Sequence, residues 1–310
     1  MHFVAQSERT IFCHRHLENV ENFCVTRCPE QCYHVKESML PAFAPSARLA
    51  PSPPVLGRTL FHLKRLLRRL LGRQKAPEIV VNHPFDISNC VETSGLLESA
   101  QLVSGHPNDV FNTAYFGVPP SRFRNAIERW QSMPDAPHMQ ICRLVDVGCG
   151  KGRAVLLGSA MPFRDVIGIE LHPELARIAT SNLERWSMRA DAVAPASIVC
   201  ADAPTVIGSL LNGATLLYVY NPFRPPVLRQ MLRAIVAQRC ILSAPVDILY
   251  LYPEHEDVFR EFPEFQRLWH DQISLAPEDM VDGLSSALDP CSLYRLRLSE
   301  ARTPARLMQL

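Results

Sequence analysis

Three closely spaced glycines after an acid form the pattern in this chain most suited to binding a ligand. From Leu144 the sequence reads L-V-D-V-G-C-G-K-G-R, so two apolar residues lead to Asp146 and then to the glycines. Such a pattern predicts a buried strand ending in a turn whose backbone can lie against a ligand. A dinucleotide-binding G-x-G-x-x-G would need a glycine at Arg153, so the spacing argues against a nicotinamide cofactor. A turn without any ligand is the plain alternative for Gly148, Gly150 and Gly152.

Acids also stand at the ends of the next two predicted strands. Residues 165–170 end in Glu170, 24 residues after Asp146, and a Rossmann-like fold places its acceptor for ribose hydroxyls at about that spacing of 20. Residues 196–200 run into Asp202. The alternatives are a surface glutamate for Glu170 and a simple helix cap for Asp202.

A fourth predicted strand ends in an amide and an aromatic side chain. Residues 214–223 read A-T-L-L-Y-V-Y-N-P-F, apolar throughout as in a strand buried on both faces. Asn221 and Phe223 would then stand at the carboxyl edge of the sheet, where ligands of open α/β sheets bind. Asn-Pro is also an ordinary turn initiator.

These motifs together resemble those of the class I S-adenosylmethionine-dependent methyltransferases. The resemblance covers Asn112 to Leu298 and is strongest from Leu144 to Phe223. It implies an α/β fold: a Rossmann-like, doubly wound, mostly parallel seven-stranded sheet with one antiparallel strand, plus an amino-terminal extension. The remaining elements are predicted as a helix over 225–237, a strand over 246–252, a short acidic helix over 255–262, and strands over 265–273 and 291–298.

The resemblance also implies roles for individual residues in holding S-adenosylmethionine. Asp146 would hold the ammonium group directly or through water, and Glu170 the ribose hydroxyls. Asp202 would accept from the adenine amino group while the following backbone N–H meets a ring nitrogen. The cofactor-binding residues expected in this way are Asp146, Gly148, Cys149, Gly150, Gly152, Glu170, Leu171, Asp202, Ala203 and Asn221.

The methyl acceptor is expected beside Asn221, where Tyr220 and Phe223 would help to orient it. Asn-Pro-Phe is partly similar to the N-P-P-Y or N-P-P-F of amino-group methyltransferases and to the N-N-F of non-SET histone-lysine methyltransferases. Tyr115, which precedes a proline-containing turn, is interpreted either as a lid or substrate-edge residue or as a packing residue. The reaction expected is direct displacement at a methyl carbon, which depends mainly on alignment.

Composition favours a globular enzyme. The chain has 310 residues, 47% hydrophobic residues and a formal net charge of +1, which excludes a disordered or strongly basic nucleic-acid-coating protein. Its ten cysteines form no disulfide-dense pattern, and no apolar run of about 18 residues or signal-peptide core is present. We therefore expect a cytoplasmic protein, with peripheral membrane contact as an option.

The amino-terminal part is expected to differ from the rest. We interpret residues 1–56 as a disordered arm or linker, or as sequence upstream of a start at Met39. Cys24, Cys28 and Cys32 lie within it, but paired C-x-x-C is absent and no metal is expected. The predicted domains are 1–56, a basic helix with a connecting segment over 57–110, the methyltransferase domain over 111–300, and a tail over 301–310.

The basic helix admits a second class of function. Residues 58–75 hold seven basic residues and no acid, with leucines along one helical face. This face could bind an anionic membrane surface or an acidic partner, or could pack on its own domain. Three hypotheses follow: a methyltransferase of unknown acceptor, a protein-lysine or other macromolecular methyltransferase, and a non-catalytic cofactor-binding adaptor tethered by this helix.

Overall fold

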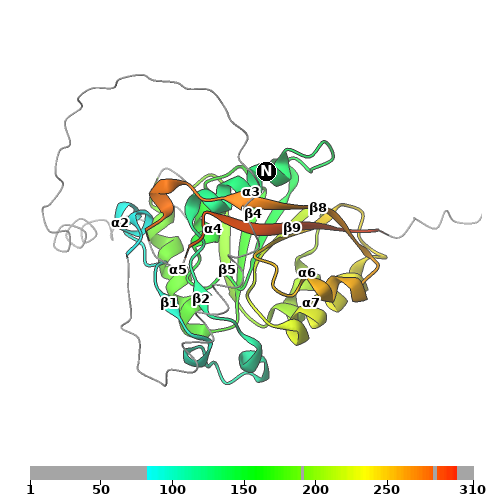
Figure 1. Ribbon diagram of the computed structural model, residues 1–310, viewed down its shortest axis with the longest axis horizontal. Coiled ribbons are helices and arrows are strands. Elements are labelled where there is room, and N and C mark those ends of the chain that lie inside the picture. Colours follow the sequence, from blue (N-terminus) through cyan, green and yellow to red (C-terminus); the bar gives the residue numbers. More distant parts are fainter. Residues whose placement is uncertain (1–81, 190–191, 282–284, 299–310) are drawn as a thin grey trace, which may run out of the picture. The chain divides into compact units, whose positions relative to one another are not determined.

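The computed structural model describes residues 82–189, 192–281 and 285–298 (Figure 1). The predictions for residues 1–56, for the basic helix over 58–75, for Cys24, Cys28 and Cys32 and for the tail over 301–310 therefore lie outside the described residues. Within the described part of the chain, no helix is long and apolar enough to cross a membrane.

A seven-stranded sheet forms the centre of the molecule, in the order β5-β4-β3-β6-β7-β9-β8. The five strands from β5 to β7 are parallel, whereas β9 is antiparallel to both of its neighbours. This confirms the predicted mostly parallel sheet with one reversed strand. The strands are β3 (Arg143–Val147), β4 (Asp165–Glu170), β5 (Ala196–Cys200), β6 (Thr215–Tyr220), β7 (Val246–Leu251), β8 (Phe265–Ser274) and β9 (Leu288–Leu296).

Helices follow the parallel strands, as expected for a doubly wound fold. Proline occupies the first turn of the helices that start at Pro120, Pro173 and Pro225, because proline has no N–H to bond there and has the helical φ. The α-helices are α2 (Pro84–Asn89), α3 (Pro120–Gln131), α4 (Arg153–Ser159), α5 (Pro173–Ser187), α6 (Ala203–Leu210) and α7 (Pro225–Gln238).

Short elements complete the described chain. A two-stranded sheet pairs β1 (Leu96–Leu97) with β2 (Tyr115–Phe116). The segment predicted as a short acidic helix over 255–262 is a 3-10 helix, η4 (Glu256–Glu261). The other 3-10 helices are η1 (Ser99–Gln101), η2 (Pro107–Phe111), η3 (Met139–Ile141) and η5 (Pro277–Asp279).

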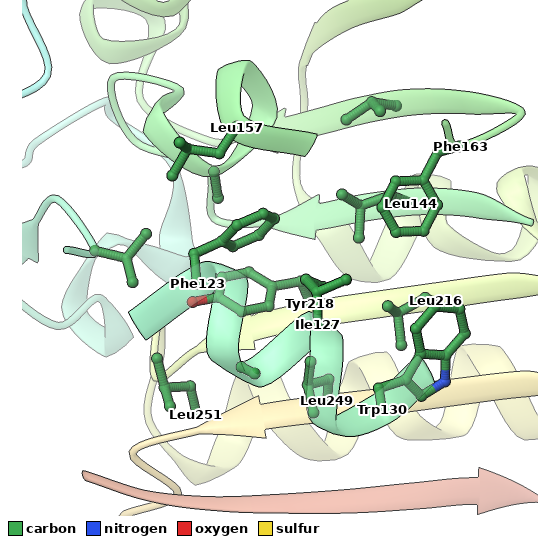
Figure 2. Close-up of a cluster of buried hydrophobic side chains, with 14 of the residues drawn as sticks. Phe123, Ile127, Trp130, Leu144, Leu157, Phe163, Leu216, Tyr218, Leu249 and Leu251 are labelled. Atoms are coloured by element: carbon green, nitrogen blue, oxygen red, sulfur yellow. The ribbon is translucent and has the colours of Figure 1, made fainter. Parts of the chain in front are cut away.

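The sheet separates two hydrophobic cores. On one face α3, α4 and α5 pack against alternate strand residues, and Phe123, Ile127 and Trp130 form the buried stripe of α3 (Figure 2). On the other face α6 and α7 pack against the intervening residues, such as Leu217 and Val219. Since successive side chains of a strand point to opposite faces, a strand buried on both faces must be apolar throughout, as β6 is.

Candidate functional site

An open cavity lies at the carboxyl ends of the parallel strands. It has a volume of about 920 Å³ and is lined by the segments that follow β3, β4, β5 and β6, together with the segment around β2. This edge contains the topological switch point of the sheet, because β4 lies on one side of β3 and β6 on the other. The predicted residues that line it are Tyr115, Asp146, Gly148, Cys149, Gly150, Glu170, Leu171, Asp202, Ala203, Tyr220 and Phe223.

The glycine turn that follows β3 needs glycine for two reasons. Gly148, Gly150 and Gly152 all have positive φ, at 74°, 56° and 86°. A Cβ on Gly148 would also lie 2.4 Å from Pro222, and one on Gly150 would lie 2.1 Å from the Tyr115 ring. The turn therefore brings its backbone against both the fourth strand end and the segment that carries Tyr115.

Two buried carboxyl groups line the cavity at the ends of β3 and β4. Glu170 accepts hydrogen bonds from the backbone N–H groups of Gly150 and His172, both at 2.8 Å. Burial raises the pKa of Glu170 above its usual value despite these bonds. Burial, with the nearby Glu170 charge, raises the pKa of Asp146 to about 8. No described residue donates a hydrogen bond to the Asp146 carboxyl group, so it can bind a cation or a donor from a ligand.

Asp202 stands at the end of β5 and lines the same cavity. Although it is the N-cap residue of α6, its side chain makes no capping bond. Its Oδ1 instead accepts from the side-chain amide of Asn108 at 3.0 Å. The cap alternative from the sequence therefore does not describe this side chain.

Asn221 lies beside the cavity but does not line it. The residue has a left-handed φ of 45°. Its side-chain Nδ2 donates to Glu254 at 3.0 Å, and its Oδ1 accepts from the Tyr250 hydroxyl at 3.1 Å. Both polar atoms of the Asn221 amide thus make hydrogen bonds within the chain, and each keeps one further donor or acceptor site.

Tyr115 covers the glycine turn. Its ring lies against Gly150, and its hydroxyl donates to the backbone oxygen of Thr93 at 2.7 Å. The Lys151 ammonium lies 5.9 Å from the ring centroid. The side chain is half-buried and lines the cavity.

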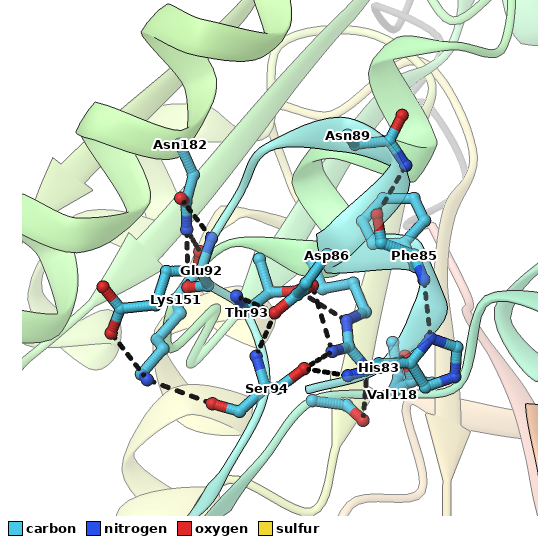
Figure 3. Close-up of polar contacts among 12 residues, drawn as sticks. His83, Phe85, Asp86, Asn89, Glu92, Thr93, Ser94, Val118, Lys151 and Asn182 are labelled. Carbon is cyan, nitrogen blue, oxygen red and sulfur yellow. Dashed lines mark hydrogen bonds and ion pairs between the residues drawn. The ribbon is translucent and has the colours of Figure 1, made fainter. Parts of the chain in front are cut away.

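Sequence reasoning missed a segment that packs against the glycine turn, residues 82–97, which we call the strap (Figure 3). Asp86 of the strap accepts from the backbone N–H groups of Thr93 and Ser94, both at 2.6 Å, and pairs with Arg153 at 3.4 Å. Arg153 is buried and also donates from Nε to the Thr93 hydroxyl at 2.6 Å.

Asn182 of α5 fixes the same strap from the other side. Its side chain accepts from the Glu92 N–H and donates to the Glu92 carbonyl, both at 2.8 Å. The same amide donates to the Lys151 carbonyl at 2.9 Å. The packed body thus includes residues ahead of position 111, where the sequence was interpreted to begin the domain.

The chain is similar, at low sequence identity, to several solved structures. No protein-family model matches the chain, and no curated protein matches it. TrmN from Thermus thermophilus is 14% identical, with a TM-score of 0.41 over 58% of this chain and 49% of TrmN. A SAM-dependent methyltransferase from Anabaena variabilis is 12% identical, with a TM-score of 0.40 over 58% of this chain and 87% of the other.

A third solved structure, a mutant of MtNAS in complex with S-adenosylmethionine, is 16% identical, with a TM-score of 0.40 over 57% of this chain and 62% of the other. The part of TrmN that this chain matches is about half of the length of TrmN. Similarities of this size carry no argument about activity. The fold is established by the strand order and the direction of each strand.

Proposed function

We propose that this chain is an S-adenosylmethionine-dependent methyltransferase. The observation that carries the proposal is the Asp146 carboxyl group, buried in the cavity with no donor from the described residues and lying close to Glu170. Two buried carboxylates favour a ligand that brings positive charge and hydroxyl donors. S-adenosylmethionine has both, in its ammonium and sulfonium groups and its ribose.

The remaining residues fit the other parts of that molecule. Glu170 uses its two oxygens for the N–H groups of Gly150 and His172 and keeps lone pairs for ribose hydroxyls. Asp202 bonds Asn108 through one oxygen and can accept an amino hydrogen through the other. Ala203 begins α6, and the N–H groups in the first turn of a helix have no partner within the helix.

The chain's part in the chemistry is then mainly alignment and exclusion of water. When bound, S-adenosylmethionine supplies a methyl group already activated by positively charged sulfur. Tyr115 over the glycine turn, with Tyr220 and Phe223 at the cavity wall, would hold the reacting groups in place and limit solvent access. A general base is required only if the acceptor arrives protonated.

Calorimetric titration with S-adenosylmethionine and with NAD tests the proposal. We expect a dissociation constant in the micromolar range for S-adenosylmethionine, and a loss of at least about 10-fold in Asp146→Ala and in Glu170→Ala. Glu174→Ala is the matched control, because this glutamate is exposed and pairs only with Arg177 on the helix surface. Binding of NAD without binding of S-adenosylmethionine would refute the proposal.

A further inference from the structure

The Tyr218 hydroxyl is a buried polar group with no hydrogen-bond partner among the described residues. The side chain is 1% exposed, and it lines the cavity. A buried hydroxyl without a partner destabilises the folded state, so its presence needs an explanation. A ligand that bonds the hydroxyl would supply one.

Tyr218 is well placed to meet a ligand near the reacting groups. It pairs with Asp146 in the register of β6 and β3, so the two side chains leave neighbouring strands on the same face. In Figure 2 its ring runs beside Phe123, and its hydroxyl points towards the carboxyl ends of the strands, where Leu251 lies. The edge of Phe123 packs on the ring with the centroids 5.1 Å apart, which fixes its orientation.

Asn221, beside which the methyl acceptor was expected, and the carbonyl groups of its turn already make hydrogen bonds within the chain. The Asn221 carbonyl accepts from the Thr113 hydroxyl at 2.6 Å, and the Pro222 carbonyl accepts from the Thr113 N–H at 3.1 Å. The Asn221 amide is bonded to Glu254 and Tyr250. Each of these oxygens thus accepts one hydrogen bond within the chain and keeps a second lone pair, whereas the Tyr218 hydroxyl has no partner among the described residues.

We propose that the Tyr218 hydroxyl oxygen orients the methyl acceptor by accepting a hydrogen bond from its N–H or O–H. The inference rests on the proposed methyltransferase function and names the acceptor class, a neutral amine or hydroxyl. The cavity wall carries Asp146, Glu170 and Asp202, which would repel an anionic acceptor.

The transfer step balances without a further reactant. The acceptor lone pair forms the new bond to the methyl carbon as the carbon–sulfur bond breaks, and the electrons of that bond remain on sulfur as a neutral thioether. The acceptor's proton is then released to solvent. The hydrogen bond to Tyr218 directs the lone pair towards the methyl carbon, so Tyr218 acts by alignment.

The probe is sinefungin, an S-adenosylmethionine analogue in which a carbon bearing an amino group replaces the methyl-bearing sulfur. That amino group occupies the place of the transferred methyl and can donate to a hydroxyl on the acceptor side. Calorimetry on Tyr218→Phe should give at least about a 10-fold weaker affinity for sinefungin than the unaltered chain shows. The affinities for S-adenosylmethionine and S-adenosylhomocysteine should stay within about twofold.

Tyr294→Phe is the matched control, because its hydroxyl also comes from the sheet but bonds Glu256 and does not line the cavity. It should change none of the three affinities. Equal weakening of all three ligands in Tyr218→Phe would place the hydroxyl at the methionine moiety and overturn the inference, as would unchanged sinefungin binding. Failure of all three ligands to bind the unaltered chain would refute the proposed function instead, so the two failures are distinguishable.

Discussion

Among single residues, Asp146 shows how the cavity differs from an ordinary strand end. A carboxyl group at the tip of a strand usually finds water or a backbone donor, and Glu170 has two such donors. Asp146 has none among the described residues, and burial with the Glu170 charge raises its pKa to about 8. In the free protein, the ionised Asp146 carboxylate therefore lacks donors from the described residues that would stabilise its charge. A bound cation would stabilise this carboxylate.

This difference predicts how stability depends on pH. Because the folded-state pKa of Asp146 lies above its unfolded value, the native state binds the proton more tightly. The favourable contribution of protonated Asp146 to the free energy of unfolding is present at low pH and is lost as pH rises towards about 8. Asp146→Asn should therefore raise the free energy of unfolding by on the order of 5 kcal/mol at pH 8 and by about 1–2 kcal/mol at pH 5. Urea unfolding at both values checks this, and an equal effect at the two pH values would contradict it.

Among the elements, the strands could be predicted and the strap could not. Each of β3 to β6 is an apolar run that ends at an acid or at Asn221, so local pattern alone indicated both the strand and its functional end. The strap depends on Arg153 and Asn182, which lie 60 and 90 residues from the strap residues that they bond. No local sequence pattern predicts contacts between residues so far apart in the chain.

The same limit applies to the side chains at the site. The strand ends predicted from the sequence indicated that Asp146, Glu170 and Asp202 would lie at one edge of the sheet, and all three line the cavity. The roles of these residues stay predictions. The sequence could not indicate that the Asn221 amide turns to Glu254, since this follows from a left-handed backbone and a partner 33 residues away.

The strap should contribute strongly to stability through Asp86. This carboxylate satisfies two backbone N–H groups and pairs with Arg153, whose side chain is 4% exposed. Asp86→Ala leaves a buried guanidinium without its ion-pair partner, so we expect a loss of about 3–5 kcal/mol in the free energy of unfolding. Glu174→Ala, which breaks only an exposed i,i+3 pair, should leave the free energy of unfolding nearly unchanged. Equal effects of the two substitutions in urea unfolding would rule out this role for the strap.

For the molecule as a whole, the cavity is lined by segments that lie far apart in the sequence, between Leu102 and Val227. The segment around β2, which is hydrogen-bonded to the strap, forms one wall with the glycine turn, and the Asn-Pro-Phe turn after β6 forms a second wall that packs against the same glycine turn. Hydrogen bonds join these walls directly, since Thr113 bonds both Asn221 and Pro222. A ligand that contacts both walls should therefore stabilise the strap and the sheet together.

Two tryptophans allow the stabilisation by a ligand to be measured separately for the strap and for the sheet. Trp186 packs on Phe85 of the strap, whereas Trp130 of α3 stacks on Phe163 and donates to Asp247 of β7. Variants whose only tryptophan is Trp186 or Trp130 should show coincident urea transitions by fluorescence. S-adenosylmethionine at 100 times its dissociation constant should raise the free energy of unfolding by about 2.7 kcal/mol for both probes. A transition at Trp186 that precedes the one at Trp130, or that alone responds to the ligand, would show that the strap folds independently of the sheet.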